Sequence, residues 1–126
     1  MLSIKNLSKV YGGGKKAVDN ISLEIEAGEF IAFIGTSGSG KTTALRMINR
    51  MIEATEGQIA INGKDVRKMN PVELRRKIGY VIQQIGLMPH MTIRENIVLV
   101  PKLLKWSQEK KEKKAKELIK LVDLPE

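Results

Sequence analysis

The chain has 126 residues, a formal net charge of +8 and no cysteine. This length suits one domain around one hydrophobic core, and the lack of cysteine excludes disulfide bonds and cysteine-based zinc sites. No apolar run in the sequence approaches the ~18–20 residues that a membrane-spanning helix needs.

Three segments alternate apolar and polar residues, as half-buried strands do. They are residues 2–7, 21–25 and 57–61. The glycines at 12–14 predict a flexible turn, and the Asn-Gly pair at 62–63 is a strong hairpin signal. These segments predict a small antiparallel sheet packed on the rest of the fold.

Two apolar runs, residues 30–34 and 78–82, indicate buried strands of a parallel sheet. A glycine-rich loop follows the first run and leads into a predicted helix that continues to Ile52. Apolar residues share one face of this helix, at positions 44, 47, 48, 51 and 52. Strand, loop and helix in this order predict an α/β fold.

The glycine-rich loop carries the most specific motif. Residues 35–42 read Gly-Thr-Ser-Gly-Ser-Gly-Lys-Thr, a full match to the phosphate-binding pattern G-x-x-x-x-G-K-[ST]. Its glycines let the backbone approach a polyphosphate, whose oxygens accept from N–H groups near the helix start. Lys41 supplies a positive charge between the terminal phosphates, and Thr42 is placed to ligate Mg²⁺. The predicted nucleotide-binding residues of the loop are Gly35, Thr36, Ser37, Gly38, Ser39, Gly40, Lys41, Thr42 and Thr43.

Three further helices are predicted from their N-terminal caps. An Asn-Pro pair at 70–71 starts a short helix, residues 92–95 form a capping box, and Ser107 caps the last helix. Pro101 is expected to kink the second of them. The apolar stripe of the last helix consists of residues 115, 118, 119 and 122.

A lysine-rich segment carries much of the positive charge. Between residues 102 and 120 there are eight lysines and three glutamates. The pairs Glu109–Lys113 and Glu112–Lys116 have the i,i+4 spacing of ion pairs on a solvated helix. No aromatic residues are interleaved for base stacking. A solvated helix face is therefore expected, and nucleic acid is not expected as a partner.

Taken together, these motifs resemble the first half of an ABC transporter ATPase. The resemblance covers essentially the whole chain. It is carried by Tyr11, the loop 35–43, Thr55-Glu56-Gly57 and the segment 78–84, Ile-Gly-Tyr-Val-Ile-Gln-Gln. Residues 83–97 are similar to importer ATPases, most of all to those that serve glycine betaine, carnitine and choline uptake.

The resemblance implies a partial P-loop NTPase core with an N-terminal antiparallel β subdomain in residues 1–83. The Q-loop and the start of a helical subdomain would follow in residues 84–126. ATP and Mg²⁺ are the implied ligands: Tyr11 would stack on adenine, and Gln83 would join Thr42 at Mg²⁺ and reach the attacking water.

The implied function is to energise uptake of a quaternary amine or an amino-acid-type solute. The implied partners are a second copy of the full-length ATPase and transmembrane permease subunits, which would be contacted through the loop 84–92 with its single histidine, His90. Such a subunit lies peripherally on the cytoplasmic face of the cell membrane.

Three features of that family are missing from the sequence: a strand that ends in Asp-Glu, a Leu-Ser-Gly-Gly-Gln signature and a later switch histidine. The chain is therefore expected to be an N-terminal fragment that hydrolyses no ATP by itself. Two other functions remain open. One is a stand-alone P-loop enzyme of the small-molecule kinase type, and the other is a non-catalytic module that binds nucleotide or nucleic acid.

Overall fold

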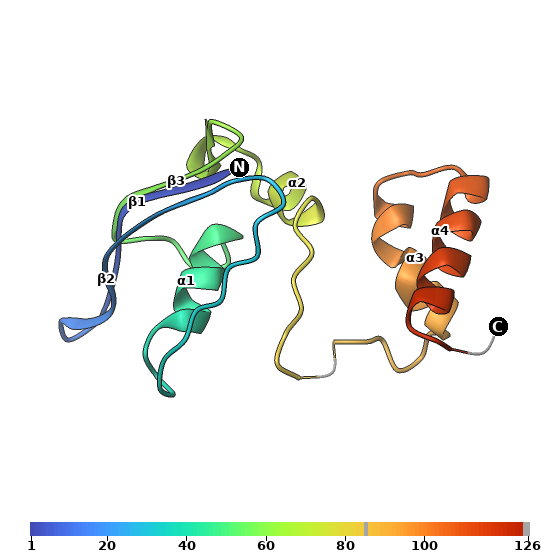
Figure 1. Cartoon of the computed structure of the whole chain (residues 1–126), viewed down its shortest axis with the longest axis horizontal. Coiled ribbons are helices and arrows are strands. Elements are labelled where there is room, and N and C mark those ends of the chain that lie inside the picture. The colour runs from blue at the N-terminus through green and yellow to red at the C-terminus, as the bar shows by residue number, and fades with distance from the viewer. Residues whose placement is uncertain (85, 125–126) are drawn as a thin grey trace. The chain divides into compact units, whose positions relative to one another are not determined.

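The computed structural model describes residues 1–84 and 86–124. They form two compact units, Met1–Ile78 and Gly79–Glu126 (Figure 1). The first unit contains a four-stranded antiparallel sheet in the order β2-β1-β3-β4. Its strands are β1 (Leu2–Tyr11), β2 (Lys15–Ile25), β3 (Glu56–Ile61) and β4 (Lys64–Asp65). The predicted antiparallel sheet is thus confirmed, and β1 and β2 are longer than the sequence indicated.

The turns of the sheet follow their sequence signals. Glycines 12–14 connect β1 to β2, with φ of 83° at Gly13 and 79° at Gly14. Asn62 and Gly63 connect β3 to β4, with φ of 49° and 76°. Two successive positive φ angles are typical of the two-residue turn that suits the twist of a hairpin. The predicted hairpin at this pair is confirmed.

An irregularity in β1 decides which side chains enter the core. Between Lys5 and Ser8 the register with β3 shifts, and Asn6 has a φ of 49°. Leu7 is therefore fully buried together with Ile4, although strict alternation would not put these two residues on one face. Gly57 of β3 makes room for this bulge, because a Cβ there would lie 2.4 Å from the Asn6 carbonyl oxygen.

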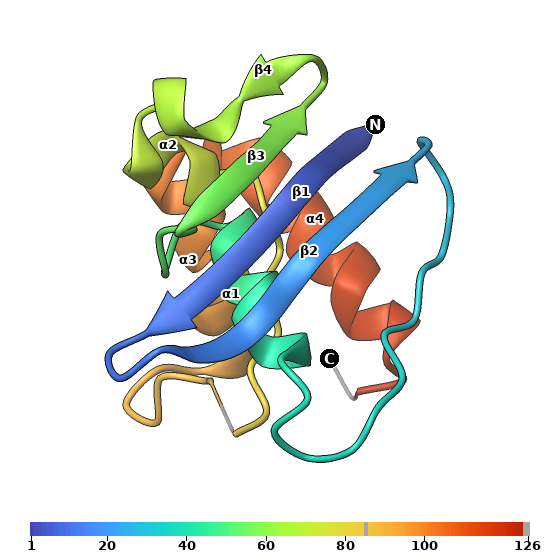
Figure 2. The same ribbon diagram turned by 90° about the vertical axis from the view of Figure 1, so that its left-hand side faces the viewer.

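The core of the first unit lies on the face of the sheet that α1 (Lys41–Ile48) covers (Figure 2). Buried side chains from the sheet, from α1 and from the segment after β4 meet there. They are Ile4, Leu7, Val18, Ala44, Met47, Ile59, Val66 and Leu74. The non-polar residues of this one cluster supply the main driving force for folding of the unit.

The two predicted buried strands are wrong as strands. Residues 30–34 and 78–82 contain neither helix nor strand. A strand exists only where its backbone groups pair with a neighbour, and no strand of the described residues pairs with either segment. Apolar side chains in them are consequently exposed: Phe30 by 92%, Ile34 by 94% and Val81 by 95%.

Helix α1 ends four residues before the predicted limit, at Ile48 rather than Ile52. Asn49 is the C-cap, and Arg50 follows with a φ of 54°. The Met51 N–H then donates to the Arg46 carbonyl, and the Arg50 N–H donates to the Met47 carbonyl. This pair of hydrogen bonds defines a Schellman ending with Arg50 in the place that glycine usually takes. Apolar periodicity alone could not locate it, because Ile52 still packs against the core.

Two short helical segments follow the sheet. The 3₁₀ helix η1 (Val66–Lys68) is capped by Asp65, whose carboxylate accepts from the Arg67 N–H. Helix α2 (Pro71–Arg76) begins after Asn70, whose side-chain oxygen accepts from the N–H groups of residues 72 and 73. The predicted cap and the proline at the first helical position are confirmed.

The second unit contains a helical hairpin. Helices α3 (Ile93–Leu103) and α4 (Gln108–Leu121) run in opposite directions, side by side (Figure 1). Both predicted caps are confirmed: Thr92 and Glu95 form the capping box, and the Ser107 hydroxyl accepts from the Lys110 N–H. Helix α3 continues through Pro101 for two residues, and the expected kink stays a prediction.

The charges on α4 pair differently from the prediction. Glu112 forms its ion pair with Arg94 of α3, and Glu117 pairs with Lys114. Lys113 and Lys116, the expected partners of Glu109 and Glu112, form no ion pair with described residues. For Lys116 the reason is that Glu112 pairs with Arg94 of the other helix. Among residues 1–84 and 86–124, none of the helices has the length and the apolar composition that a membrane-spanning segment requires.

Candidate functional site

The glycine-rich loop ends where α1 begins. Gly38 and Gly40 have φ of 78° and 92°, a region that residues with a side chain rarely adopt. The Ser39 N–H donates to the Thr36 carbonyl at 3.2 Å and closes a turn. No side chain caps α1, and its first turn contains no acidic residue. Its first N–H groups are therefore open to an anionic ligand, which the helix dipole also favours.

Gly40 fixes the loop against the sheet. A Cβ at this position would lie 2.0 Å from the Ala17 carbonyl oxygen and 3.3 Å from a methyl group of Val18. The backbones of the loop and β2 thus approach more closely than any side chain would allow. The motif explains why Gly40 is a glycine, but only the tertiary structure shows that β2 is the neighbour.

Lys41 holds the loop together from inside. Its ammonium group donates to the carbonyl oxygens of Gly35 at 2.8 Å and Thr36 at 2.7 Å, and to the Ser39 hydroxyl at 3.0 Å. These contacts position a positive charge at the centre of the loop, where phosphate oxygens would be bound.

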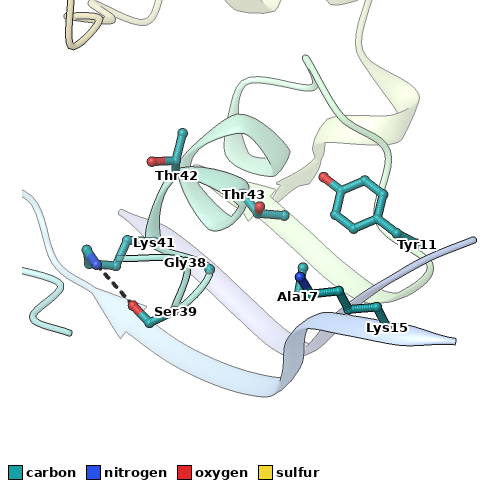
Figure 3. A pocket seen from close by; sticks show the side chains of 9 residues that line it. Tyr11, Lys15, Ala17, Gly38, Ser39, Lys41, Thr42 and Thr43 are labelled. Atoms are coloured by element: carbon teal, nitrogen blue, oxygen red, sulfur yellow. Dashed lines mark hydrogen bonds between the residues drawn. The ribbon is translucent and has the colours of Figure 1, made fainter. Parts of the chain in front are cut away.

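A pocket of about 370 Å³ joins this loop to the β1–β2 hairpin. Its lining residues are Tyr11, Lys15, Ala17, Gly38, Ser39, Gly40, Lys41, Thr42 and Thr43. Figure 3 shows the tyrosine ring on the hairpin side and Lys41 on the loop side. The pocket thus unites Tyr11 with six residues of the predicted loop. Of the other predicted residues, Gly35 and Thr36 contact Lys41, and Ser37 lies in the loop outside the lining.

Two lysines near Tyr11, Lys9 and Lys15, were not predicted from the sequence. The ammonium of Lys9 lies 5.3 Å from the centre of the Tyr11 ring and donates to the Glu53 carbonyl at 2.7 Å, so it covers part of the ring by a cation–π contact. Lys15 lines the pocket itself. A signal for Lys15 was present in the sequence, because a tight glycine turn places it opposite Tyr11.

Thr42 and Gln83 have the oxygen donors that suit Mg²⁺. The Thr42 hydroxyl is exposed at the pocket (Figure 3). The described residues contain no group of three or more His, Cys, Asp or Glu that could hold a metal ion alone. A single hydroxyl at a phosphate site fits an ion whose remaining ligands are phosphate and water oxygens. Gln83 belongs to the other unit, and its role at Mg²⁺ stays a prediction.

The segment 84–92, of which residue 85 lies outside the described part, forms neither helix nor strand. Asn96 of α3 shapes its second half: the side-chain oxygen accepts from the Met88 N–H at 2.7 Å, and the amide nitrogen donates to the carbonyls of Met88, Met91 and Thr92. His90 is exposed in this segment. The sequence reasoning missed Asn96, because nothing marks it as different from other polar residues of a helix.

Glu95 is held in the capping box by charge-assisted hydrogen bonds. Its carboxylate accepts from the Thr92 N–H at 2.7 Å and from the Thr92 hydroxyl at 2.9 Å. These two hydrogen bonds hold the pKa of Glu95 below its usual value, and the one from the Thr92 N–H has the larger effect. The ionised glutamate therefore stabilises the start of α3.

Comparison with known proteins agrees with this geometry. The chain is 70% identical over its full length to the carnitine transport ATP-binding protein OpuCA of Listeria monocytogenes. It is 64% identical over 124 residues to the glycine betaine/carnitine/choline transport ATP-binding protein OpuCA of Bacillus subtilis. It spans 32% and 33% of these two relatives, about a third of their length.

Among solved structures, the chain is similar to the ATP-binding cassette MJ0796 in a dimeric post-hydrolysis state bound to ADP and Pi. The TM-score is 0.83 at 38% identity, and the match covers 100% of this chain and 59% of that one. The predicted α/β fold class of a partial cassette is thereby confirmed. Residues 18–126 match the sequence profile described as ABC transporter, and the chain therefore belongs to the ABC transporter family.

Proposed function

We propose that the chain binds ATP with Mg²⁺ in the pocket between the β1–β2 hairpin and the loop 35–43. The observation that carries this proposal is the shared pocket: an aromatic ring and a phosphate-binding loop lie on opposite sides of one space of about 370 Å³. An adenine ring can stack on Tyr11, while the N–H groups at the start of α1 and the ammonium of Lys41 bind phosphate oxygens.

The same proposal assigns the metal. Thr42 and Gln83 would hold Mg²⁺, which neutralises phosphate charge when it is bound. Gln83 would also position the attacking water. The remaining residues of the loop, 35–40 and Thr43, contribute backbone donors and the close approach that the glycines allow.

As a whole protein, the function that fits best is an ABC importer ATPase that energises uptake of a quaternary amine such as glycine betaine, carnitine or choline. The names of the relatives support this substrate class. Family membership favours it over a kinase-like enzyme and over a nucleic-acid-binding module. Such a subunit would work with a second copy of the ATPase and with permease subunits contacted through residues 84–92, on the cytoplasmic face of the membrane.

The 126 residues by themselves are expected to bind ATP without hydrolysing it. Their sequence contains no strand ending in Asp-Glu that could activate water, and no Leu-Ser-Gly-Gly-Gln segment that could close over the phosphates. Phosphate release should therefore equal that of a Lys41→Ala control.

The decisive experiment is calorimetric titration of the chain and of Lys41→Ala with Mg·ATP. A charge-assisted contact of this kind contributes roughly 1.5–3 kcal/mol, so the variant should lose about one to two decades in affinity. Lys16→Ala is the matched control, because Lys16 lies outside the pocket and pairs with Asp19 at 3.0 Å.

Lys41 also contacts its own loop, so the variant needs a test of folding. Circular dichroism melting should show that Lys41→Ala retains the sheet and the helices. If a folded Lys41→Ala binds ATP as tightly as the parent chain, the nucleotide site is assigned wrongly.

A further inference from the structure

Lys15 is a second lysine on the wall of the proposed nucleotide pocket. It lies at the start of β2, directly opposite Tyr11 in the register of β1 and β2. Residues opposite each other in an antiparallel pair point to the same face. Lys15 and Tyr11 accordingly line the pocket together with residues 38–43. In Figure 3 the ammonium end of Lys15 lies beside Ala17.

The ammonium group of Lys15 has no partner of its own. Within residues 1–84 and 86–124 it forms no hydrogen bond or ion pair. Its neighbour Lys16 differs in both respects, because it pairs with Asp19 at 3.0 Å and does not line the pocket. Lys41 also differs, since its ammonium is held by three acceptors of the loop. Lys15 therefore offers three free donors and a positive charge on a flexible stem.

The electrostatics of the pocket favour an anionic ligand near Lys15. Lys15 and Lys41 are the charged residues of the lining, and no acidic residue belongs to it. The first turn of α1 contains no acidic residue either. Two ammonium groups in one pocket repel each other unless an anion lies between or beside them.

We propose that Lys15 binds the phosphate chain of the nucleotide from the side of the hairpin, facing the loop that holds Lys41. This inference rests on the proposed function. The hairpin then recognises both parts of the ligand: Tyr11 contacts the base, and Lys15 contacts the phosphates. Because Lys15 adjoins Tyr11 in register, the length of the β1–β2 turn sets the distance between these two contacts.

The test compares Lys15→Gln with Lys16→Gln, because both variants remove one positive charge from adjacent positions of one strand. Each is titrated by calorimetry with Mg·ATP, ADP and adenosine at low salt and at physiological salt. Lys15→Gln should weaken ATP binding about fivefold, as expected for one partly exposed charge contact. Adenosine binding should not change, and the loss for ATP should shrink as salt is added. Lys16→Gln should bind ATP as the parent chain does.

The remaining outcomes separate an error in the role of Lys15 from an error in the proposed function. If Lys15→Gln equals Lys16→Gln while Lys41→Ala loses binding, the role of Lys15 is wrong and the proposed function stands. If Lys15→Gln weakens adenosine as much as ATP, Lys15 acts at the base and the phosphate contact is wrong. If the parent chain binds no nucleotide, or Lys41→Ala binds normally, the proposed function itself is wrong.

Discussion

In the unit Met1–Ile78, eight apolar side chains are buried in one cluster. In Gly79–Glu126 the buried residues within the described part are Ala115 and Ile119, both on α4, and α3 has none. The first unit is held by a core that joins strands and helices distant in sequence. The second has, besides the Arg94–Glu112 ion pair between its helices, mainly local contacts: a capping box, a serine cap and the hydrogen bonds of Asn96. All residues that line the nucleotide pocket belong to the first unit.

The largest expected effect distinguishes the two units by their cores. Leu7→Ala should destabilise the first unit by about 2–5 kcal/mol, because it removes a fully buried side chain and leaves a cavity. Ile119→Ala should cost less, since its surroundings on α4 are largely exposed. Amide hydrogen exchange in β1 measures the loss of stability caused by Leu7→Ala, and exchange in α4 measures the loss caused by Ile119→Ala. Equal losses for the two variants would contradict the difference in packing.

The next effect concerns two glycines of one loop. Gly40→Ala should destabilise the first unit by about 2–3 kcal/mol and weaken ATP binding, because its positive φ is strained and its Cβ would meet the Ala17 carbonyl. Gly38 has a similar φ, but a Cβ at this position would have no other atom within 4 Å. Gly38→Ala should cost only the ~1 kcal/mol of the backbone conformation. Denaturant unfolding compares them, and equal costs would rule out contact with β2 as the cause.

A smaller effect is expected at the cap of α3, where stability should depend on pH. The pKa of Glu95 is lower in the folded state, so its contribution to stability is present above its unfolded pKa and is lost as the pH falls through the folded pKa. Below about pH 4.5, the protection of the α3 amides relative to their intrinsic exchange rate should therefore fall. Glu95→Gln should remove this dependence, whereas Glu109→Gln should preserve it. If Glu95→Gln leaves the acid dependence unchanged, the capping box is not the cause of that dependence.

The smallest effect is expected on α4. Reversing the charge of Lys110, Lys111, Lys113 and Lys114 should change ATP affinity by less than about twofold at physiological salt, where charges are screened beyond ~8 Å. No α4 residue lines the pocket. Titration calorimetry with Mg·ATP is the measurement. A large loss of affinity would show that this helix acts on the nucleotide site.

Sequence reasoning located the elements whose signals are local. The turns at 12–14 and 62–63, the cap at Asn70 and the box at 92–95 lie where they were predicted. In each of them, neighbouring residues satisfy the backbone groups, so a few positions contain all the information needed. The errors have a common cause as well. Residues 30–34 and 78–82 have the composition of buried strands, but a strand also needs a partner, and no strand of the described residues pairs with either segment.

The sequence by itself determined the phosphate-binding loop, because its glycines, Lys41 and Thr42 are adjacent and their pattern is specific. Only the tertiary structure decided what surrounds the loop. The bulge at Asn6 fits against Gly57, the Ala17 carbonyl lies against Gly40, and the hairpin register places Lys15 beside Tyr11 at the pocket. The first two contacts join residues far apart along the chain, and the third brings a local hairpin pair to the pocket. All three depend on backbone distances of a few ångströms, which packing sets and residue pattern does not encode.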